Sequence, residues 1–123
     1  MSEKAGLGLA VANEDGSAAG QTGSSLHFFE YFGDYPCVTN QVVDFLIQTG
    51  KKGVGLDTIG LDPIADGNLT LHRQLLSTNK TVIIENLCNL DKLPRGLFTF
   101  CALPLRYENA DGSPIRAVAI LED

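Results

Sequence analysis

The fold is decided by the stretch Thr81-Val-Ile-Ile84, which runs directly into Glu85. Four consecutive β-branched residues predict a short strand, and their continuous apolar character is typical of a strand covered on both faces. Further back, the stretch Gly53-Val-Gly-Leu-Asp57 predicts a second short buried strand, whose glycines permit close approach of another backbone. Buried strands that alternate with helices predict an α/β protein with a mixed sheet flanked by helices.

Two helices are predicted from the spacing of apolar residues. Thr39 is placed to cap the first helix, the apolar residues of the stretch 42–47 share one broad face, and Gly50 is placed to end it. Asn68 is placed to cap the second helix. The apolar residues expected to point inward from this second helix are Leu69, Leu75 and Leu76.

The two ends of the chain differ in composition. Two apolar stretches, Phe98–Leu105 and Ile115–Leu121, flank a polar connection and predict a C-terminal β-hairpin. Residues 1–25 are dominated by Gly, Ala and Ser and form an atypical N-terminal arm, in which only Leu7–Val11 predicts a short strand. Residues 26–123 are expected to form a single α/β domain, and we expect a contact with another chain to hold the arm in place.

Composition and charge exclude several classes of protein. The 123 residues carry a formal net charge of −6 with a sequence pI near 4.7, so the surface repels nucleic acid and anionic lipid. No apolar stretch reaches the roughly 18 residues of a membrane helix, and the start does not resemble a signal peptide, which predicts a cytoplasmic protein. Cys37, Cys88 and Cys101 form no C-x-x-C pair and are predicted to be reduced thiols, mostly buried.

Few residues are available for catalysis. The only histidines are His27, placed in an aromatic cluster, and His72, near the start of the second predicted helix. Glu85 ends a buried strand near the same rim, so an imidazole and a carboxylate could converge there on a metal that accepts nitrogen and oxygen ligands. The alternative is a satisfied hydrogen-bond network without metal. Asp57 and Asp62 are predicted to shape the loop between strand and helix, and a carboxylate-only cation site that joins them to Glu85 is a weaker alternative.

Several blocks, in this order, resemble the metal-dependent hydrolase family called cyclases, which includes the bacterial kynurenine formamidases. The likeness covers about residues 30–121. Its blocks are Gly53–Pro63, His72–Leu76, Val82–Leu87 with Asn89-Leu90 and Leu93-Pro94, and Phe98–Leu105, Asp111–Pro114 and Arg116–Ile120. The resemblance implies the C-terminal part of that family's swivelling β/β/α fold, and it implies catalytic and metal-binding roles for His72 and Glu85. It further implies a zinc or manganese cofactor whose bound hydroxide attacks the amide, ester or lactone carbonyl of a small-molecule substrate.

The family's principal ligand motif, H-x-G-T-H-x-D-x-P, is absent from this sequence, which therefore resembles only the C-terminal half. Two hypotheses follow. The chain belongs to a metal-dependent hydrolase whose remaining ligands come from another chain or a longer gene product, or it is a non-catalytic, self-associating fragment or degenerate paralogue. Both predict a homo-oligomer, because sheet edges and apolar faces left exposed need covering.

Overall fold

A computed structural model of the protein describes residues 9–12, 17–21 and 35–121. Six strands form one sheet in the order β4-β3-β1-β2-β5-β6. Only β3 and β4 pair in parallel, and the other neighbours pair antiparallel. The prediction of an α/β protein with a mixed sheet is thus confirmed. In the described part of the chain, no helix is long and apolar enough to cross a membrane.

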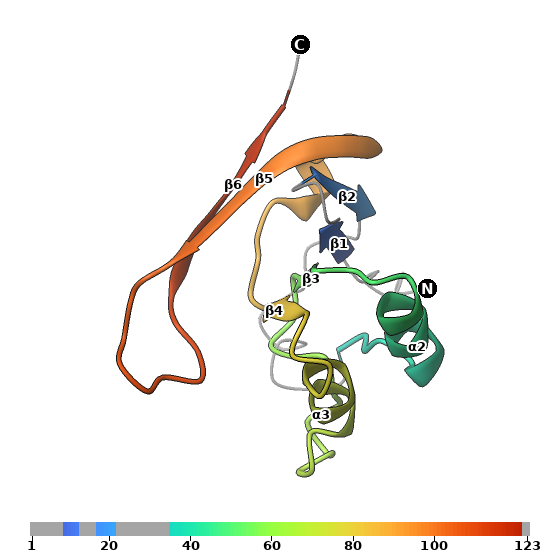
Figure 1. Ribbon diagram of the computed structural model, residues 1–123. Helices are drawn as coiled ribbons and strands as arrows, with labels where there is room; N and C mark the ends of the chain where they lie inside the picture. The colour runs from blue at the N-terminus through green and yellow to red at the C-terminus, as the bar shows by residue number, and fades with distance from the viewer. Residues whose placement is uncertain (1–8, 13–16, 22–34, 122–123) are drawn as a thin grey trace.

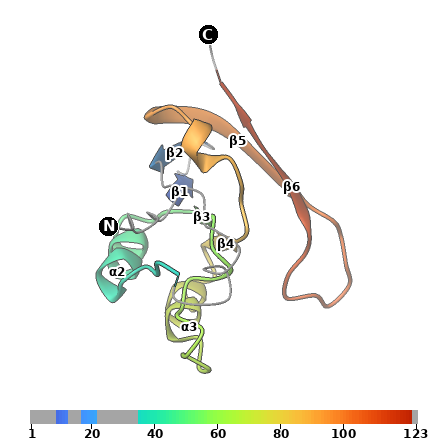
Figure 2. The ribbon, with the colours of Figure 1, turned by 180° about the vertical axis from the view of Figure 1, so that it is seen from behind.

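The elements follow each other along the chain as strands, helices and a closing hairpin (Figures 1 and 2). They are β1 (Leu9–Ala12), β2 (Ser17–Gln21), α2 (Asn40–Gln48), β3 (Gly53–Leu56), α3 (Thr70–Leu76), β4 (Val82–Ile84), the 3₁₀ helix η1 (Leu90–Lys92), β5 (Gly96–Pro104) and β6 (Ile115–Ile120).

Strands β1 and β2 lie in the middle of the sheet, between β3 and β5. β1 confirms the short strand expected near Leu7–Val11, whereas β2 was not predicted, because its sequence Ser-Ala-Ala-Gly-Gln has no β-branched or aromatic residue. The pairing Ala12↔Gly53 joins β1 to β3, and Ala18↔Phe98 joins β2 to β5. The division of the chain at residue 25, and a contact of the arm with another chain, stay predictions.

Helix α2 begins and ends where the sequence predicts. Thr39 is the N-cap residue in extended conformation, although its side chain makes no capping hydrogen bond. At the other end Gly50 has φ +66°, its N–H donates to Ile47 O at 3.1 Å, and Lys51 N donates to Leu46 O at 3.0 Å. This pair of bonds is the Schellman motif, and it uses the left-handed conformation that glycine adopts without strain.

Helix α3 differs from its prediction at its first residues. Its N-cap residue is Leu69, in left-handed conformation, so the prediction that Asn68 caps the helix is wrong. Leu71 and Leu75 are the buried residues, whereas Leu69 and Leu76 are about half exposed. The prediction is therefore confirmed for Leu75 and wrong for Leu69, which precedes the helix, and for Leu76, because the buried face is formed by residues four positions apart.

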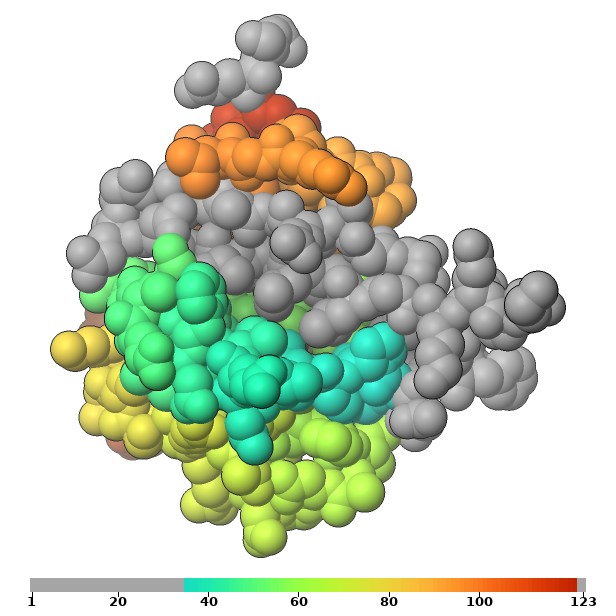
Figure 3. All heavy atoms as spheres, turned by 90° about the vertical axis from the view of Figure 1, so that its right-hand side faces the viewer, coloured from blue at the N-terminus to red at the C-terminus, as the bar shows by residue number. Residues whose placement is uncertain are grey.

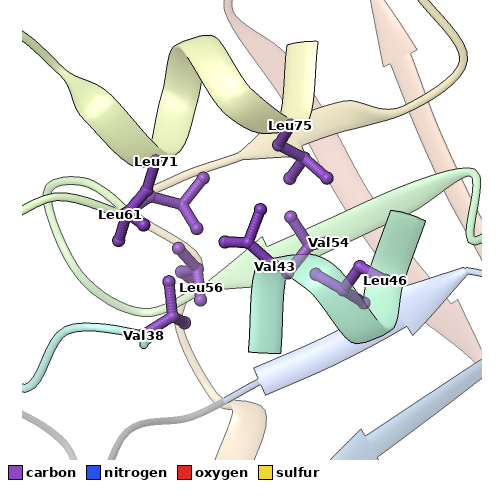
Figure 4. Packing of buried hydrophobic residues seen from close by; sticks show 8 residues of the cluster. All are labelled: Val38, Val43, Leu46, Val54, Leu56, Leu61, Leu71 and Leu75. Carbon is purple, nitrogen blue, oxygen red and sulfur yellow. The ribbon is translucent and has the colours of Figure 1, made fainter. Parts of the chain in front are cut away.

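The hydrophobic core fills the space between the two helices and β3 (Figure 4). Its buried members are Val38, Val43, Leu46, Val54, Leu56, Leu61, Leu71 and Leu75. β3 is buried along its whole length, as predicted. β4 pairs only with β3 and forms an edge of the sheet, and its Val82 is exposed, so the expectation that β4 is covered on both faces is wrong.

At the opposite edge, β5 and β6 form the predicted C-terminal hairpin. The surfaces of β5 and α3 lie at opposite ends of the molecular face in Figure 3. Cys88 is exposed, and Cys37 and Cys101 are half-buried, so the expectation of mostly buried thiols is wrong, although none of the three forms a disulfide, as predicted.

Candidate functional site

The site lies where β3 and β4 end. Since these strands are parallel, their carboxyl ends meet at the same edge of the sheet, which is where open α/β sheets bind ligands. The segments that follow the strands remain hydrogen-bonded: Asn86 N donates to Thr58 O at 3.0 Å, and Leu87 N to Leu56 O at 2.9 Å. These bonds hold Glu85, the residue after β4, beside the loop that follows β3.

Asp62, in that loop, fixes the start of helix α3. Its side chain is buried, its Oδ1 accepts from Leu71 N at 2.6 Å, and its Oδ2 accepts from His72 N at 3.0 Å. The first N–H groups of a helix have no partner within the helix, and a carboxylate also suits the positive end of the helix dipole. Asp62 therefore fixes where the backbone of His72 lies.

His72 is held between two carboxylates. Its Nδ1 lies 2.5 Å from Asp62 Oδ2, and its Nε2 lies 2.7 Å from Glu85 Oε1. Burial lowers the pKa of His72, but the hydrogen bonds and negative charges of Asp62 and Glu85 outweigh burial, so the pKa lies above its ordinary value. In the protonated form, both ring N–H groups donate to carboxylates. The Asp62 side chain is 1% exposed and that of Glu85 is 30% exposed, so Glu85 is the carboxylate that faces solvent.

Tyr35 and Gly60 enclose the pair of His72 and Glu85. A methyl group added at Gly60 would lie 3.4 Å from Glu85 Oε1, 3.6 Å from His72 Cε1 and 3.6 Å from Tyr35 Oη, so this glycine borders all three side chains. The Tyr35 hydroxyl donates to the main-chain oxygen of Asp62 at 2.5 Å. Burial, followed by the nearby Cys37, Glu85 and Asp62, raises the pKa of Tyr35, so it remains a hydrogen-bond donor.

The structure thus brings together the two residues, His72 and Glu85, that the sequence singled out, and their roles in binding metal and in catalysis stay predictions. The contact of Asp62 with His72 was missed, because the sequence places Asp62 ten residues away, in a loop, before a proline. The predicted loop role of Asp57 also stays a prediction. His27 lies outside the described residues, and the exposed Arg116 lies on β6, at the far edge of the sheet.

A divalent metal fits these residues in its donor chemistry. An imidazole nitrogen and a carboxylate oxygen face each other, and the other ring nitrogen is held by a carboxylate, as is usual for histidines that bind metals. The pair gives two ligands, whereas a catalytic zinc takes three from protein. Within the described ranges, no three His, Cys, Asp or Glu side chains are grouped to hold a metal, which also gives no support to a carboxylate-only site.

The fold and the site together define an α/β protein with a carboxylate–imidazole–carboxylate arrangement at the carboxyl ends of two parallel strands. Comparison with curated proteins relates the sequence to one family. A kynurenine formamidase of Bacillus anthracis is 37% identical over 83 residues, which are 68% of this chain and 39% of the relative. One of Polaromonas naphthalenivorans is 46% identical over 65 residues, 53% of this chain and 28% of the relative.

The predicted resemblance is confirmed: the chain contains a cyclase-family region that is like the kynurenine formamidases. The chain spans 28–39% of the length of these two relatives. No family model matches the chain, and no solved structure matches it. The likeness to the C-terminal part of the family's fold therefore stays a prediction.

Proposed function

We propose that this chain supplies part of the active site of a metal-dependent hydrolase, in which His72 and Glu85 hold a zinc or manganese ion. One observation carries the proposal: His72 Nε2 and Glu85 Oε1 face each other at 2.7 Å, on a ring that Asp62 fixes from its other side. Two kynurenine formamidases related to this region support a substrate with an amide carbonyl, and esters and lactones have the same reacting group.

Each side chain of the site has a definite role in this proposal. Asp62 Oδ2 accepts a hydrogen bond from His72 Nδ1–H, which would leave the lone pair on Nε2 available to a cation. Glu85 would contribute a carboxylate oxygen, and metal binding would release a proton, because the ion would replace the hydrogen bond between Nε2 and Oε1. An ion held there would lower the pKa of a water molecule and polarise a substrate carbonyl. Tyr35 holds the loop of Asp62 in place through its main-chain oxygen.

The remaining metal ligands come, in this proposal, from residues outside this sequence, since the motif H-x-G-T-H-x-D-x-P is not in it. We therefore expect this chain alone to bind the ion weakly and to have little or no hydrolase activity. A cytoplasmic location remains part of the proposal.

One observation favours a second candidate, a non-catalytic module. His72 has a partner at each ring nitrogen, so the described residues satisfy the imidazole without any metal. In that case the side chains of Asp62, His72 and Glu85 stabilise the turn between β3 and α3 and have no catalytic or metal-binding role.

Metal titration separates the two candidates. Zn²⁺ and Mn²⁺ are titrated calorimetrically into the chelator-treated chain and into the variants His72→Ala and Glu85→Gln. If the pair holds the ion, each variant weakens binding at least about tenfold, because a ligand is lost. The control is Asp44→Asn, which changes an exposed carboxylate of α2 that accepts a hydrogen bond from Gln74 Nε2 at 2.7 Å and lies outside the site.

Hydrolysis of an N-formyl aromatic amide, an ester and a lactone is measured on the same samples, with and without metal. Zinc binding that is equal in all four proteins, or no binding to the unaltered chain at millimolar metal, contradicts the metal-site proposal and favours the non-catalytic module.

A further inference from the structure

Two loops of the structure contain the same sequence, Ala-Asp-Gly, at residues 65–67 before helix α3 and at residues 110–112 between β5 and β6. Asp-Gly is the pair at which an aspartate most readily rearranges, because glycine has no side chain to hinder its nitrogen from reaching the preceding carboxyl group. A third pair, Asp15-Gly16, lies outside the described residues. Since the two described pairs match in sequence, a difference in their reactivity must come from the structure.

The pair Asp66-Gly67 is held at both reacting groups. The carboxylate of Asp66 accepts from Asn68 N at 2.9 Å and from Thr70 N at 3.1 Å. The nitrogen of Gly67 donates to Ala65 O at 3.2 Å. The hydrogen bonds of Thr70, followed by that of Asn68, lower the pKa of Asp66, which keeps the carboxyl group in its charged, less reactive form. The nitrogen and the carboxyl group therefore cannot react unless the loop opens first.

The pair Asp111-Gly112 is open at both reacting groups. Within residues 9–12, 17–21 and 35–121, no hydrogen bond or ion pair holds the Asp111 carboxylate, and the nitrogen of Gly112 has no acceptor. Residues 103–112 are all exposed, and Figures 1 and 2 show that the loop between β5 and β6 stands clear of both helices. The main chain around this pair is thus free to bring the two groups together.

We propose that Asp111-Gly112 is a site of spontaneous modification, at which aspartate becomes isoaspartate, and that the fold protects Asp66-Gly67 from the same reaction. The Gly112 nitrogen attacks Cγ of Asp111, a C–N bond forms, and the carboxyl hydroxyl leaves with the nitrogen's proton as water. Water then opens the resulting cyclic imide. Opening at the former main-chain carbonyl gives isoaspartate, and opening at Cγ restores aspartate. No reactant other than water is needed, and the proposed metal site has no part in it.

The modified loop has a definite chemistry. Isoaspartate lengthens the main chain by one carbon atom and leaves the α-carboxylate of residue 111 free. The base of the loop lies outside the altered bond, where Ser113 Oγ donates to Leu105 O at 2.8 Å, so we expect β5 and β6 to stay paired. A carboxyl methyltransferase that recognises the free α-carboxylate of isoaspartate is the class of enzyme that acts on this product, and the exposure of the loop leaves it accessible.

The test uses the unaltered full chain, stored at neutral pH in water labelled with heavy oxygen. Each passage through the imide replaces one carboxyl oxygen by a solvent oxygen, so mass spectrometry of the digested protein measures the reaction at each Asp-Gly pair. We expect Asp111 to take up label at least about tenfold faster than Asp66, because hydrogen bonds to the charged Asp66 must break first. In urea the two rates should become similar, since the protection of Asp66 comes from the fold.

The substitutions Gly112→Ala and Gly67→Ala form a matched pair of variants. Neither glycine has a positive φ, and a Cβ added at either one meets nothing within 4 Å, so both variants should fold. Gly112→Ala should slow the labelling of Asp111 several-fold, because the added side chain hinders the nitrogen, whereas Gly67→Ala should leave it unchanged. An isoaspartate-specific carboxyl methyltransferase should methylate the stored chain in the peptide that contains Asp111.

Three results overturn the proposal, and two of them come from the unaltered chain alone. The first is equal labelling of Asp66 and Asp111 in the folded protein. The second is a difference between them that persists in urea, which would assign it to sequence and not to structure. The third is a Gly112→Ala variant in which Asp111 takes up label as fast as before.

Discussion

The two ends of the sheet are stabilised in different ways. At the β3–β4 end, two helices cover the strands, the core is closed, and the polar side chains Asp62 and His72 have partners on every side that the structure describes. At the β5–β6 end, a long hairpin buries Phe98 and leaves the opposite face open. The first region therefore has a buried apolar core and a satisfied hydrogen-bond network within the described residues, whereas the second leaves large apolar side chains exposed.

The largest expected difference between the two regions concerns leucine truncation. Leu75→Ala removes a side chain that is 0% exposed and leaves a cavity, so the free energy of unfolding should fall by about 2–5 kcal/mol. Leu103→Ala removes an exposed side chain and should change it by less than about 0.5 kcal/mol in the monomer. Urea unfolding of dilute protein measures both. Equal losses of unfolding free energy would mean that Leu103 is packed as closely as Leu75, which contradicts the difference between the two ends.

A smaller loss of stability is expected from Asp62→Asn, which tests whether Asp62 orients His72. The amide keeps one oxygen acceptor but turns N–H groups toward Leu71 N or His72 Nδ1, so an orphaned donor should reduce the free energy of unfolding by about 1–3 kcal/mol. Loss of the carboxylate that orients His72 should also weaken zinc binding about 10–100-fold. Unfolding and calorimetry on one sample measure both quantities.

The control for this variant is Asp66→Asn. Asp66 also accepts from backbone N–H groups at the start of α3, those of Asn68 at 2.9 Å and Thr70 at 3.1 Å, and it neighbours the Asp62 side chain, but in the described part of the chain it makes no hydrogen bond with His72. It should lose stability and keep its zinc affinity. If both variants weaken zinc binding equally, the orientation of the ring is not what Asp62 contributes.

The smallest effect is a pH dependence confined to the β3–β4 end. Because the pKa of His72 is raised in the folded, metal-free protein, its contribution to stability is fully present below the ordinary value of about 6.5 and is lost as the pH rises through the folded value. In chelator, the stability difference between the unaltered chain and His72→Gln should therefore shrink as the pH rises above about 6.5. Thermal unfolding measures it. Arg116→Gln, in the hairpin, should give a difference that does not change over this window.

The sequence predicted most of the elements and the two residues at the centre of the site. Helix α2, strand β3 and the hairpin were predictable because their signals are local: an apolar face ended by Gly50, a buried strand between glycines, and two strands around a polar connection. His72 and Glu85 were found because a charge directly after a buried strand needs a partner.

What the sequence did not predict depends on contacts between distant segments. β2 has no strand signal of its own and is a strand because β1 and β5 pair with it on both sides. The register of α3 is set by Asp62 and Asp66, which lie before the helix and accept its first N–H groups. No spacing rule connects a loop aspartate to an imidazole ten positions later, so the third side chain of the site was visible only in the structure.

The residue after Glu85 has a consequence for how this region can evolve. Asn86 has φ +59°, a conformation that asparagine and glycine adopt far more readily than branched residues do. The turn it makes carries Leu87 back to hydrogen-bond with Leu56 O, so the direction of the preceding carboxylate depends on it. A branched residue at this position would therefore strain the turn, even though the side chain itself is exposed to solvent.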